Sequence, residues 1–312
     1  MERVLVTGIT GFTGSHLVQF LRQEAGVPAE LHGVSRTAGK SAEGVRFWSC
    51  DLSDAATVRE LVTTVQPTKI YHLAGSFSNE FSVDYAGNVT TTRNLLEGVG
   101  ALPSQSCRML VVGSAAEYGR VGEGCGGVSE LQQVQPISTY GLTKVFQTAL
   151  AQFYARVHKI PVIIVRPFNL IGSGASNRLF IGRLEEQIRA LTQGKIKEIT
   201  LGNLSGSRDF IDVRDAVRAY VVALERGERG EVYNVGSGHP TSVEKFVRVA
   251  LACSGIGYEK MISDRNQHSP SDASTSFFAD VTKLKRLGWY PELSIEASAG
   301  SLVSGYPLRG GK

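Results

Sequence analysis

Tyr140 and Lys144 are the two residues in this sequence best suited to exchange a proton with a bound molecule. Their spacing places the phenol and the ammonium on the same face of a helix, one turn apart. Tyrosine has an unperturbed pKa of about 10, so a nearby ammonium is needed to favour the phenolate and permit proton exchange near neutral pH. Chance also produces such pairs, so the spacing gains its meaning from its position in the fold.

That position is the start of a long predicted helix at residues 140–158, which follows a predicted strand at 108–112 and a glycine-rich loop. The loop begins with Ser114, in the stretch VGSAAEYG. In open α/β folds, ligands bind outside the carboxyl ends of the parallel strands. We therefore predict that Ser114, Tyr140 and Lys144 lie together at this edge of the sheet.

A glycine-rich turn follows the first predicted strand, at residues 4–6. Its glycines permit a tight turn, close approach of backbone N–H groups to a pyrophosphate, and close packing of the next helix on the strand. A glycine triplet has little weight alone, but this one lies between a strand and a helix at the start of a βαβ unit. We predict a dinucleotide-binding turn formed by Gly8, Thr10, Gly11, Phe12, Thr13 and Gly14.

The residues at the end of the second predicted strand, at 30–34, decide whether the site prefers NAD(H) or NADP(H). An acidic residue there would accept the ribose hydroxyls of NAD. The sequence has Ser35 and Arg36 instead, and a guanidinium matches a 2′-phosphate in charge and geometry. We predict NADP(H), with NAD(H) still open and a solvated Arg36 as the alternative. Asp51 and Leu52 follow the third strand and are expected at the adenine, although Asp51 could instead cap a helix.

Strands alternate with helical stretches through the first 165 residues, which predicts a Rossmann-type, doubly wound parallel sheet of the α/β class. The predicted strands are 4–6, 30–34, 45–50, 69–73, 108–112 and 162–166, and the predicted helices are 14–25, 55–66, 88–99 and 140–158. We expect an NADP-binding domain at 1–165, with a returning segment near 209–235. Residues 166–312 are expected to form a smaller, substrate-binding domain.

Composition excludes several classes of protein. Lys and Arg number 33 against 29 Asp and Glu and are spread along the chain, which argues against nucleic acid or a membrane as partner. The apolar runs are strand-sized, and no signal peptide is expected before the first strand. Four dispersed cysteines and six scattered histidines predict neither a disulfide framework nor a metal site. We expect a cytoplasmic protein.

Several stretches together resemble the extended short-chain dehydrogenase/reductases, over nearly the whole chain. They are TGITGFTGSHL, HLAG, VGSAAEYG, the YxxxK pair and RPFN. Within that superfamily, RPFNLIG, GNLSGSRDFIDVRDAVRAY and GEVYNVGSG look most like the GDP-4-keto-6-deoxy-D-mannose reductases, which are relatives of the GDP-mannose 4,6-dehydratases.

The resemblance implies a role for each matching residue. Tyr140 is expected to be the general acid, Lys144 to tune it and hold the nicotinamide ribose, and Ser114 to bind the substrate carbonyl. Further cofactor contacts are implied at Leu73, Ala74, Gly75 and Pro167, and substrate contacts at Glu117, Asn169, Arg183 and Arg208. Asn88 resembles the helix asparagine that supports the lysine. The resemblance also implies a homodimer that pairs the helices at 88–99 and 140–158 into a four-helix bundle.

The sequence departs from this family at three places. Leu170 stands where the reductases usually have histidine, and Ser173 replaces a proline. A stretch that normally holds a diphosphate-binding arginine reads Ser269-Pro270-Ser271-Asp272, for which Arg265 is a possible substitute. The nucleotide base and the sugar therefore stay open.

Three functions compete. The leading one is NADPH-dependent reduction of a nucleotide-linked 4-keto-6-deoxy sugar. A 4,6-dehydratase or 4-epimerase is the second, but a dehydratase needs a glutamate where this sequence has Ala116, one residue before Glu117. Epimerases reuse a tightly held NAD, whereas Ser35 and Arg36 favour NADPH. The third is a dinucleotide-sensing protein without catalysis, which an intact set of Ser114, Tyr140 and Lys144 disfavours.

Overall fold

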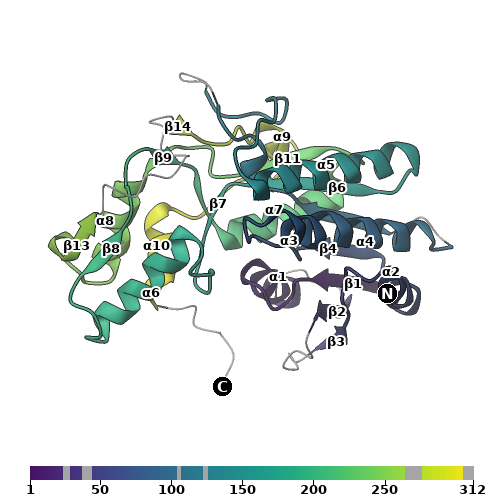
Figure 1. Ribbon diagram of the computed structural model, residues 1–312, viewed down its shortest axis with the longest axis horizontal. Coiled ribbons are helices and arrows are strands. Elements are labelled where there is room, and N and C mark those ends of the chain that lie inside the picture. Colours follow the sequence, from purple (N-terminus) through teal and green to yellow (C-terminus); the bar gives the residue numbers. More distant parts are fainter. Residues whose placement is uncertain (24–28, 37–43, 104–106, 122–125, 264–275, 305–312) are drawn as a thin grey trace.

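Seven parallel strands form the central sheet of the computed structural model, which describes residues 1–23, 29–36, 44–103, 107–121, 126–263 and 276–304 (Figure 1). Their order across the sheet is β11-β6-β5-β4-β1-β2-β3. The strands are β1 (Glu2–Thr7), β2 (Ala29–Ser35), β3 (Val45–Ser49), β4 (Lys69–His72), β5 (Arg108–Val112), β6 (Val162–Pro167) and β11 (Val232–Val235). The predicted doubly wound parallel sheet is confirmed, and β11 adds a strand at the edge beside β6.

Helices cover both faces of this sheet. The helices of the sheet region are α1 (Phe12–Gln23), α2 (Ala55–Val65), α3 (Phe81–Tyr85), α4 (Thr91–Gly100), α5 (Thr139–Val157) and α7 (Val213–Arg226). Alternate side chains of one strand enter opposite cores: Leu110 packs under α1 and α7, while Met109 and Val111 pack under α2, α4 and α5. A parallel sheet covered on both faces needs such continuous apolar strands, and β6 reads VIIV for this reason.

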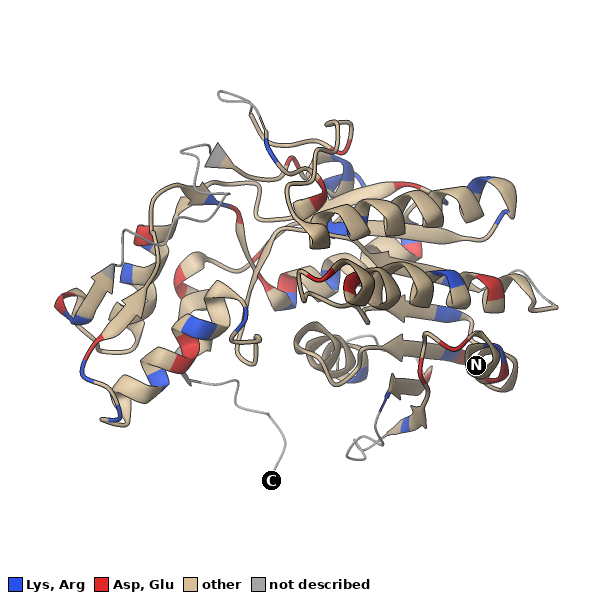
Figure 2. Ribbon diagram, viewed as in Figure 1, with Lys and Arg blue, Asp and Glu red and all other residues tan. Residues whose placement is uncertain are grey.

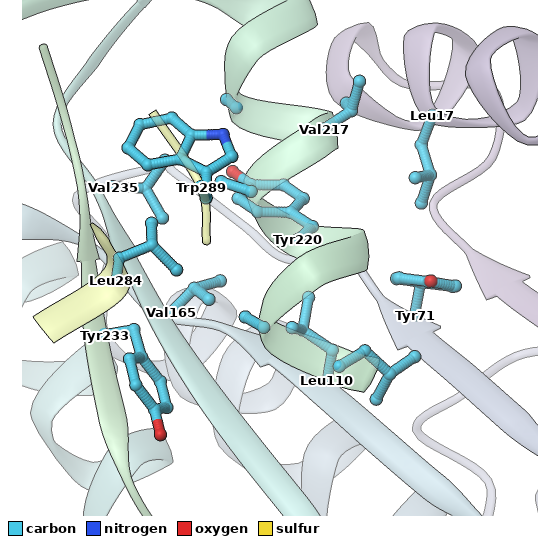
Figure 3. Close-up of a cluster of buried hydrophobic side chains, with 14 of the residues drawn as sticks. Leu17, Tyr71, Leu110, Val165, Val217, Tyr220, Tyr233, Val235, Leu284 and Trp289 are labelled. Carbon is cyan, nitrogen blue, oxygen red and sulfur yellow. The ribbon is translucent and has the colours of Figure 1, made fainter. Parts of the chain in front are cut away.

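Figure 3 shows the core under α1 and α7, where Leu17, Val217 and Tyr220 meet strand residues such as Leu110 and Val165. The side chains of all five residues are fully or almost fully buried. This packing ties α7, which comes late in the chain, to β5, β6 and α1. The carboxyl ends of those strands are thereby held in place for the site described below.

A second group of elements has its own core on one side of the sheet (Figure 1). It contains α6 (Phe180–Thr192), β8 (Ile199–Leu201), α8 (Val243–Cys253), η3 (Tyr258–Lys260), β13 (Met261–Ser263) and α10 (Ile295–Ser304). Short pairs link the two parts: β7 (Asn169–Ile171) pairs with β10 (Phe210–Asp212), and β9 (Ser207–Arg208) pairs with β12 (Thr241–Ser242) and β14 (Ser276–Phe277). The short helix α9 (Thr282–Lys285) lies beside β11.

Two further observations bear on partners. Lys and Arg are interspersed with Asp and Glu over both parts of the molecule (Figure 2). Within the described ranges, no helix combines the length and the apolarity that crossing a membrane requires, and no cluster of His, Cys, Asp and Glu could hold a metal ion.

Candidate active site

The glycine turn combines a backbone conformation that favours glycine with close contacts that leave no room for a Cβ. Gly8 follows β1 with a φ of +67°, and the Gly11 N–H donates to the Gly8 carbonyl over 2.9 Å. A Cβ on Gly8 would lie 2.8 Å from the backbone nitrogen of Ala74, and a Cβ on Gly14 would collide with the Gly8 carbonyl. Helix α1 begins directly after the turn, at Phe12, so its positive N-terminal end faces the same space.

A cleft of about 880 Å³ lies between this turn and the ends of β2, β3 and β4. Ten of the predicted cofactor contacts line it together: Gly8, Thr10, Gly11, Ser35, Arg36, Asp51, Leu52, Leu73, Ala74 and Gly75. We call this the dinucleotide cleft. Its shape suits an extended ligand that has one end at the strand ends of β2 and β3 and its phosphates at the glycine turn.

Asp51 lines this cleft and is held at one of its two carboxylate oxygens. Its Oδ1 accepts hydrogen bonds from the backbone nitrogen and the hydroxyl of Ser53, over 2.9 and 2.7 Å, and these bonds lower the pKa of Asp51. The helix cap is Asp54, which accepts from the backbone nitrogens of Ala56 and Thr57. Asp51 is therefore not the cap of α2.

A second cleft of about 500 Å³ shares Gly8, Gly11, Leu73, Gly75 and Ser76 with the first. It is lined by the remaining predicted cofactor contacts and by the catalytic candidates: Phe12, Thr13, Gly14, Ser114, Tyr140, Lys144 and Pro167. Asn169 and Leu170 lie on its far side, together with residues at the start of α6. We call this the reaction cleft. The ends of β5 and β6 thus bring together residues from several separate segments.

A helix cap at Ser138 and a close helix approach at Gly141 position Tyr140 and Lys144 beside Ser114. Ser138 caps α5 by accepting from the Gly141 nitrogen over 3.0 Å, which starts the helix just before Tyr140. Gly141 lets the helix lie close to the Ala116 carbonyl. The Tyr140 hydroxyl then lies near enough to Ser114 for the serine to favour its charged form, and the ammonium of Lys144 lies 5.7 Å from the centre of the Tyr140 ring.

Burial is the main cause of the pKa shifts of Tyr140 and Lys144. It raises the pKa of Tyr140 to about 12, with a smaller increase from the negative charges of Glu117 and Asp84 and an opposing effect of Ser114. Burial lowers the pKa of Lys144 to about 8, against the same two carboxylates. The sequence predicted a phenol whose pKa is pulled down by the ammonium; in the protein itself, desolvation has the larger effect and the shift is upward. Tyr140 therefore carries its proton at neutral pH.

Glu117 supports the site from below and does not line either cleft. It is fully buried, and its Oε1 accepts from the backbone nitrogen of Ser114 over 2.9 Å. Its Oε2 binds the guanidinium of Arg166 through two contacts of 2.8 Å. The sequence predicted that Glu117 contacts the substrate. The structure does not place it there, because Ser114 and Arg166 already occupy both of its carboxylate oxygens. Tyr118, the next residue, is also buried and donates to Asn234 over 2.6 Å.

The predicted substrate contacts are placed differently from one another. Asn169 lines the reaction cleft, and its amide nitrogen donates to the Asp209 carbonyl over 2.9 Å. Arg183 is exposed on α6, and Arg208 is half-buried on β9; neither lines this cleft. Asp209 does not pair with Arg208, since its carboxylate accepts from Ser237, Gly238 and Ala279.

Of the three departures from the family pattern, one lies in the reaction cleft. Leu170 lines the reaction cleft. Ser173 donates to Glu185 on α6 over 2.8 Å, which ties the loop after β7 to that helix. Arg265 and residues 269–272 lie outside the residues that the structure describes.

Two residues at the site, Phe77 and Arg178, have roles that the sequence did not show. Phe77 packs edge-to-face on Tyr140, with 4.9 Å between ring centres, and lines the reaction cleft. Arg178 reaches the dinucleotide cleft from the loop before α6 and makes no ion pair with any described residue. Asn88, which the resemblance assigned to supporting the lysine, contacts Ser76 and Thr143 at 2.9 and 3.0 Å, in the turn of helix next to Lys144. Phe77 comes two residues after the HLAG motif, with Ser76 between them, and this proximity was the available signal.

A glycine turn at the end of β1, opening into a cleft that Ser114, Tyr140 and Lys144 line, defines an enzyme that uses a nicotinamide dinucleotide. The model of the family described as "NAD dependent epimerase/dehydratase family" matches residues 4–236, and this chain belongs to that family. It is a nucleotide-sugar oxidoreductase. The resemblance to the extended short-chain dehydrogenase/reductases is thereby confirmed.

Individual relatives match the chain over almost its whole length. GDP-6-deoxy-D-mannose reductase of Pseudomonas aeruginosa is 28% identical, and the match covers 99% of this chain and 98% of that protein. The solved structure of RMD from Pseudomonas aeruginosa complexed with NADPH has a TM-score of 0.84 at 26% identity, covering 97% of this chain and 98% of that one. The UDP-glucose 4-epimerase of Thermotoga maritima with UDP-glucose has a TM-score of 0.84 at 25% identity, covering 97% of both chains.

Proposed function

We propose that this protein is an NADPH-dependent reductase that acts on the 4-keto group of a nucleotide-linked 4-keto-6-deoxy sugar. The proposed substrate is GDP-4-keto-6-deoxy-mannose, and the product is a sugar of the GDP-rhamnose type. The observation that carries the proposal is the continuity of the two clefts, which places Ser114, Tyr140 and Lys144 next to the glycine turn. Similarity to GDP-6-deoxy-D-mannose reductase supports the choice of sugar.

The residues of the dinucleotide cleft fit NADPH. A Cβ on Gly8 or Gly14 would collide with the backbone of Ala74 or of Gly8, so glycine at both positions keeps the turn tight and lets the N-terminus of α1 face a pyrophosphate. Arg36 offers a planar cation at the end of β2, where a 2′-phosphate would lie, and Arg178 adds a second positive charge. When bound, NADPH supplies the hydride that the sugar ketone accepts at C4.

The chain's own residues then handle the oxygen of the ketone. Ser114 holds the carbonyl oxygen by a hydrogen bond, and Tyr140 gives its proton to that oxygen as negative charge develops on it. The high pKa of Tyr140, about 12, keeps the proton available until then. The ammonium of Lys144 stabilises the phenolate that is left and holds the ribose of the nicotinamide.

Two related reactions are less well supported. A 4,6-dehydratase requires a carboxylate at position 116, which is alanine, and the neighbouring Glu117 is bound to Arg166 beneath the site. A 4-epimerase is the second candidate, favoured by the likeness to UDP-glucose 4-epimerase over the whole chain. Arg36 argues against it, because an epimerase regenerates its own NAD and needs no reduced cofactor from solution.

The decisive experiment follows the loss of NADPH absorbance with GDP-, dTDP- and CDP-linked 4-keto-6-deoxy sugars. We expect stoichiometric oxidation of NADPH with one of them. Conversion of a UDP-hexose into its 4-epimer without net loss of NADPH would overturn the reductase and establish the epimerase.

Cofactor choice yields a separate prediction. Replacing Arg36 with aspartate removes the partner of the 2′-phosphate and places a carboxylate against it. We expect NADPH affinity to fall about tenfold to a hundredfold, the cost of one hydrogen bond to a charged group, and NADH to bind relatively better. Direct titration of both cofactors measures this. Arg59→Asp makes the same charge change on the exposed side of α2 and should leave both dissociation constants unchanged. Equal constants for Arg36→Asp and the natural protein would remove Arg36 from the cofactor site.

We also propose a homodimer formed by α3, α4 and α5, which pair with the same helices of a second copy. These helices carry Phe81, Phe146, Phe153 and Val157, all large apolar side chains that are between 39% and 51% exposed. Tyr85 and Phe146 join the patch across α3 and α5, with 6.4 Å between ring centres.

The patch predicts the oligomeric state. Light scattering at micromolar concentration should give the mass of a dimer, and the double change Phe146→Glu with Phe153→Glu should give a monomer that keeps its helical spectrum. Leu131→Glu, at a residue that is 97% exposed away from these helices, is the matched control and should remain dimeric. A monomeric natural protein would contradict the proposal.

The roles of the two domains and the cellular compartment are proposed as well. We propose that residues 1–165, with the returning segment near 209–235, bind the cofactor, while the rest of 166–312, part of which has a separate core, binds the nucleotide-sugar. Free, buried thiols at Cys50 and Cys107 agree with a reducing compartment, and we propose the cytoplasm.

A further inference from the structure

Lys144 is held at the edge of the reaction cleft by two acceptors of its own chain. Its ammonium donates to the carbonyl of Val112 at the end of β5, over 2.9 Å, and to the amide oxygen of Gln147, also over 2.9 Å. Lys144 and Gln147 are both buried, and the spacing of three residues places them on one face of α5. An ammonium has three N–H groups, so one remains for the tyrosine or a ligand.

The orientation of the Gln147 amide is set from the opposite side. Its nitrogen donates to the Thr92 hydroxyl over 2.8 Å. That hydroxyl has a single proton, which it gives to the carbonyl of Asn88 over 2.6 Å, so toward Gln147 it can only accept. A reversed amide would turn its NH₂ group to the ammonium of Lys144 and its oxygen to an oxygen without a free proton.

His72 completes this arrangement. Its Nε2 lies 2.9 Å from the Thr92 hydroxyl and 3.5 Å from that of Thr91, and its Nδ1 lies 2.8 Å from the hydroxyl of Thr7. The Thr7 hydroxyl accepts from the Ala74 nitrogen over 3.2 Å and is free to donate to Nδ1. Nε2 therefore carries the proton and donates toward Thr92. Burial lowers the pKa of His72 to about 3, so the ring stays neutral and the direction of every bond is preserved.

We propose that Gln147 is a positioning residue for Lys144, with an amide that Thr92 and His72 orient so that its oxygen holds the ammonium at the cleft. All the groups in this chain of hydrogen bonds are satisfied by one assignment only. The chain ends at Thr7 and Ala74, next to the glycine turn, and so connects the lysine to the strand ends that form the dinucleotide cleft. The proposal rests on the proposed reductase only for its consequence in catalysis.

The chemical effect of Gln147 is on the charge of Lys144. Four titratable groups face the ammonium: Glu117 from the segment after β5, Asp84 from α3, the neutral His72 from β4, and Tyr140 on its own helix. Burial opposes the charge, while the two carboxylates and hydrogen bonds to the charged form favour it. Loss of the Gln147 oxygen should therefore lower the pKa of Lys144, and a carboxylate in its place should raise it.

The test titrates Lys144 directly in the ligand-free protein. Lysines labelled with ¹³C at Cε are followed by NMR against pH, and the Lys144 resonance is identified by its loss in Lys144→Met. We expect the midpoint, about 8 in the natural protein, to fall by about one unit in Gln147→Leu and to rise by about one unit in Gln147→Glu, a tenfold change each way. Gln152→Leu makes the same change on the same helix, at a residue that contacts Gly230, and should leave the midpoint in place.

A purely structural role of Gln147 would not shift the Lys144 midpoint in opposite directions in Gln147→Leu and Gln147→Glu. Midpoints that are unchanged, or that move in the same direction in both variants, would overturn the proposal. Thr92→Val provides a second route if Gln147→Leu does not fold: it removes the acceptor that orients the amide and should lower the midpoint as well. No sugar or cofactor is needed, so failure of the substrate panel and failure of this proposal are separate results.

Discussion

Tyr140→Phe should lower kcat by about 10²- to 10⁴-fold and leave KM almost unchanged, the usual effect of removing a general acid. The change keeps the ring and its edge-to-face contact with Phe77, so the packing of the cleft is preserved. What is lost is the proton that is transferred only as the hydride reaches the ketone. Steady-state kinetics with the sugar identified by the panel, between pH 6 and 9, measures this.

Substitutions of the two neighbouring residues, Lys144 and Ser114, should affect the kinetic constants to different extents. Lys144→Met should raise KM for the cofactor and also lower kcat, because the ammonium has two proposed roles. Ser114→Ala should have the smallest effect of the three, about that of one hydrogen bond to the ketone oxygen. Tyr290→Phe, which removes the hydroxyl of an exposed tyrosine, is the control and should be fully active. Near-normal kcat in Tyr140→Phe at every pH would show that another group is the acid.

Arg166→Met should destabilise the protein by about 3–5 kcal/mol, because it leaves the buried carboxylate of Glu117 without its counter-charge. Both side chains are almost completely shielded from water, and the guanidinium holds Glu117 by two contacts of 2.8 Å. Urea denaturation of the variant and the natural protein gives the difference in the free energy of unfolding. Since Glu117 also accepts from the Ser114 nitrogen, activity should fall together with stability.

A second substitution separates charge from packing. Adding Glu117→Gln to Arg166→Met removes the unpaired charge, keeps an acceptor for Ser114, and should recover a large part of the lost stability. Arg248→Met breaks the exposed pair with Glu244 on α8 and should cost about 1 kcal/mol or less. If Arg166→Met cost no more than this surface control, Glu117 would be neutral in the folded protein and its proposed ion pair would be wrong.

The glycine turn shows what short stretches of sequence determine by themselves. Gly8 must adopt a positive φ and Gly14 must lie against the Gly8 carbonyl, and both demands act within a few residues. The same is true of the strands, whose burial on both faces is visible in continuous apolar runs such as VIIV, and of the helix that Ser138 caps before Tyr140. Local sterics and periodicity decide these features, so the sheet and the arrangement of Ser114, Tyr140 and Lys144 were predictable.

The roles of charged residues depended on the tertiary structure. Glu117 reads as a substrate contact in the sequence, yet its partner Arg166 comes 49 residues later and turns it into a buried support for Ser114. Gln147 has no visible role until Thr92, 55 residues away, orients its amide. The pKa of Tyr140 is also shifted upward and not downward, because burial has the largest effect on it. Desolvation and partners distant along the chain set these charge states, and neither is expressed in the spacing of residues.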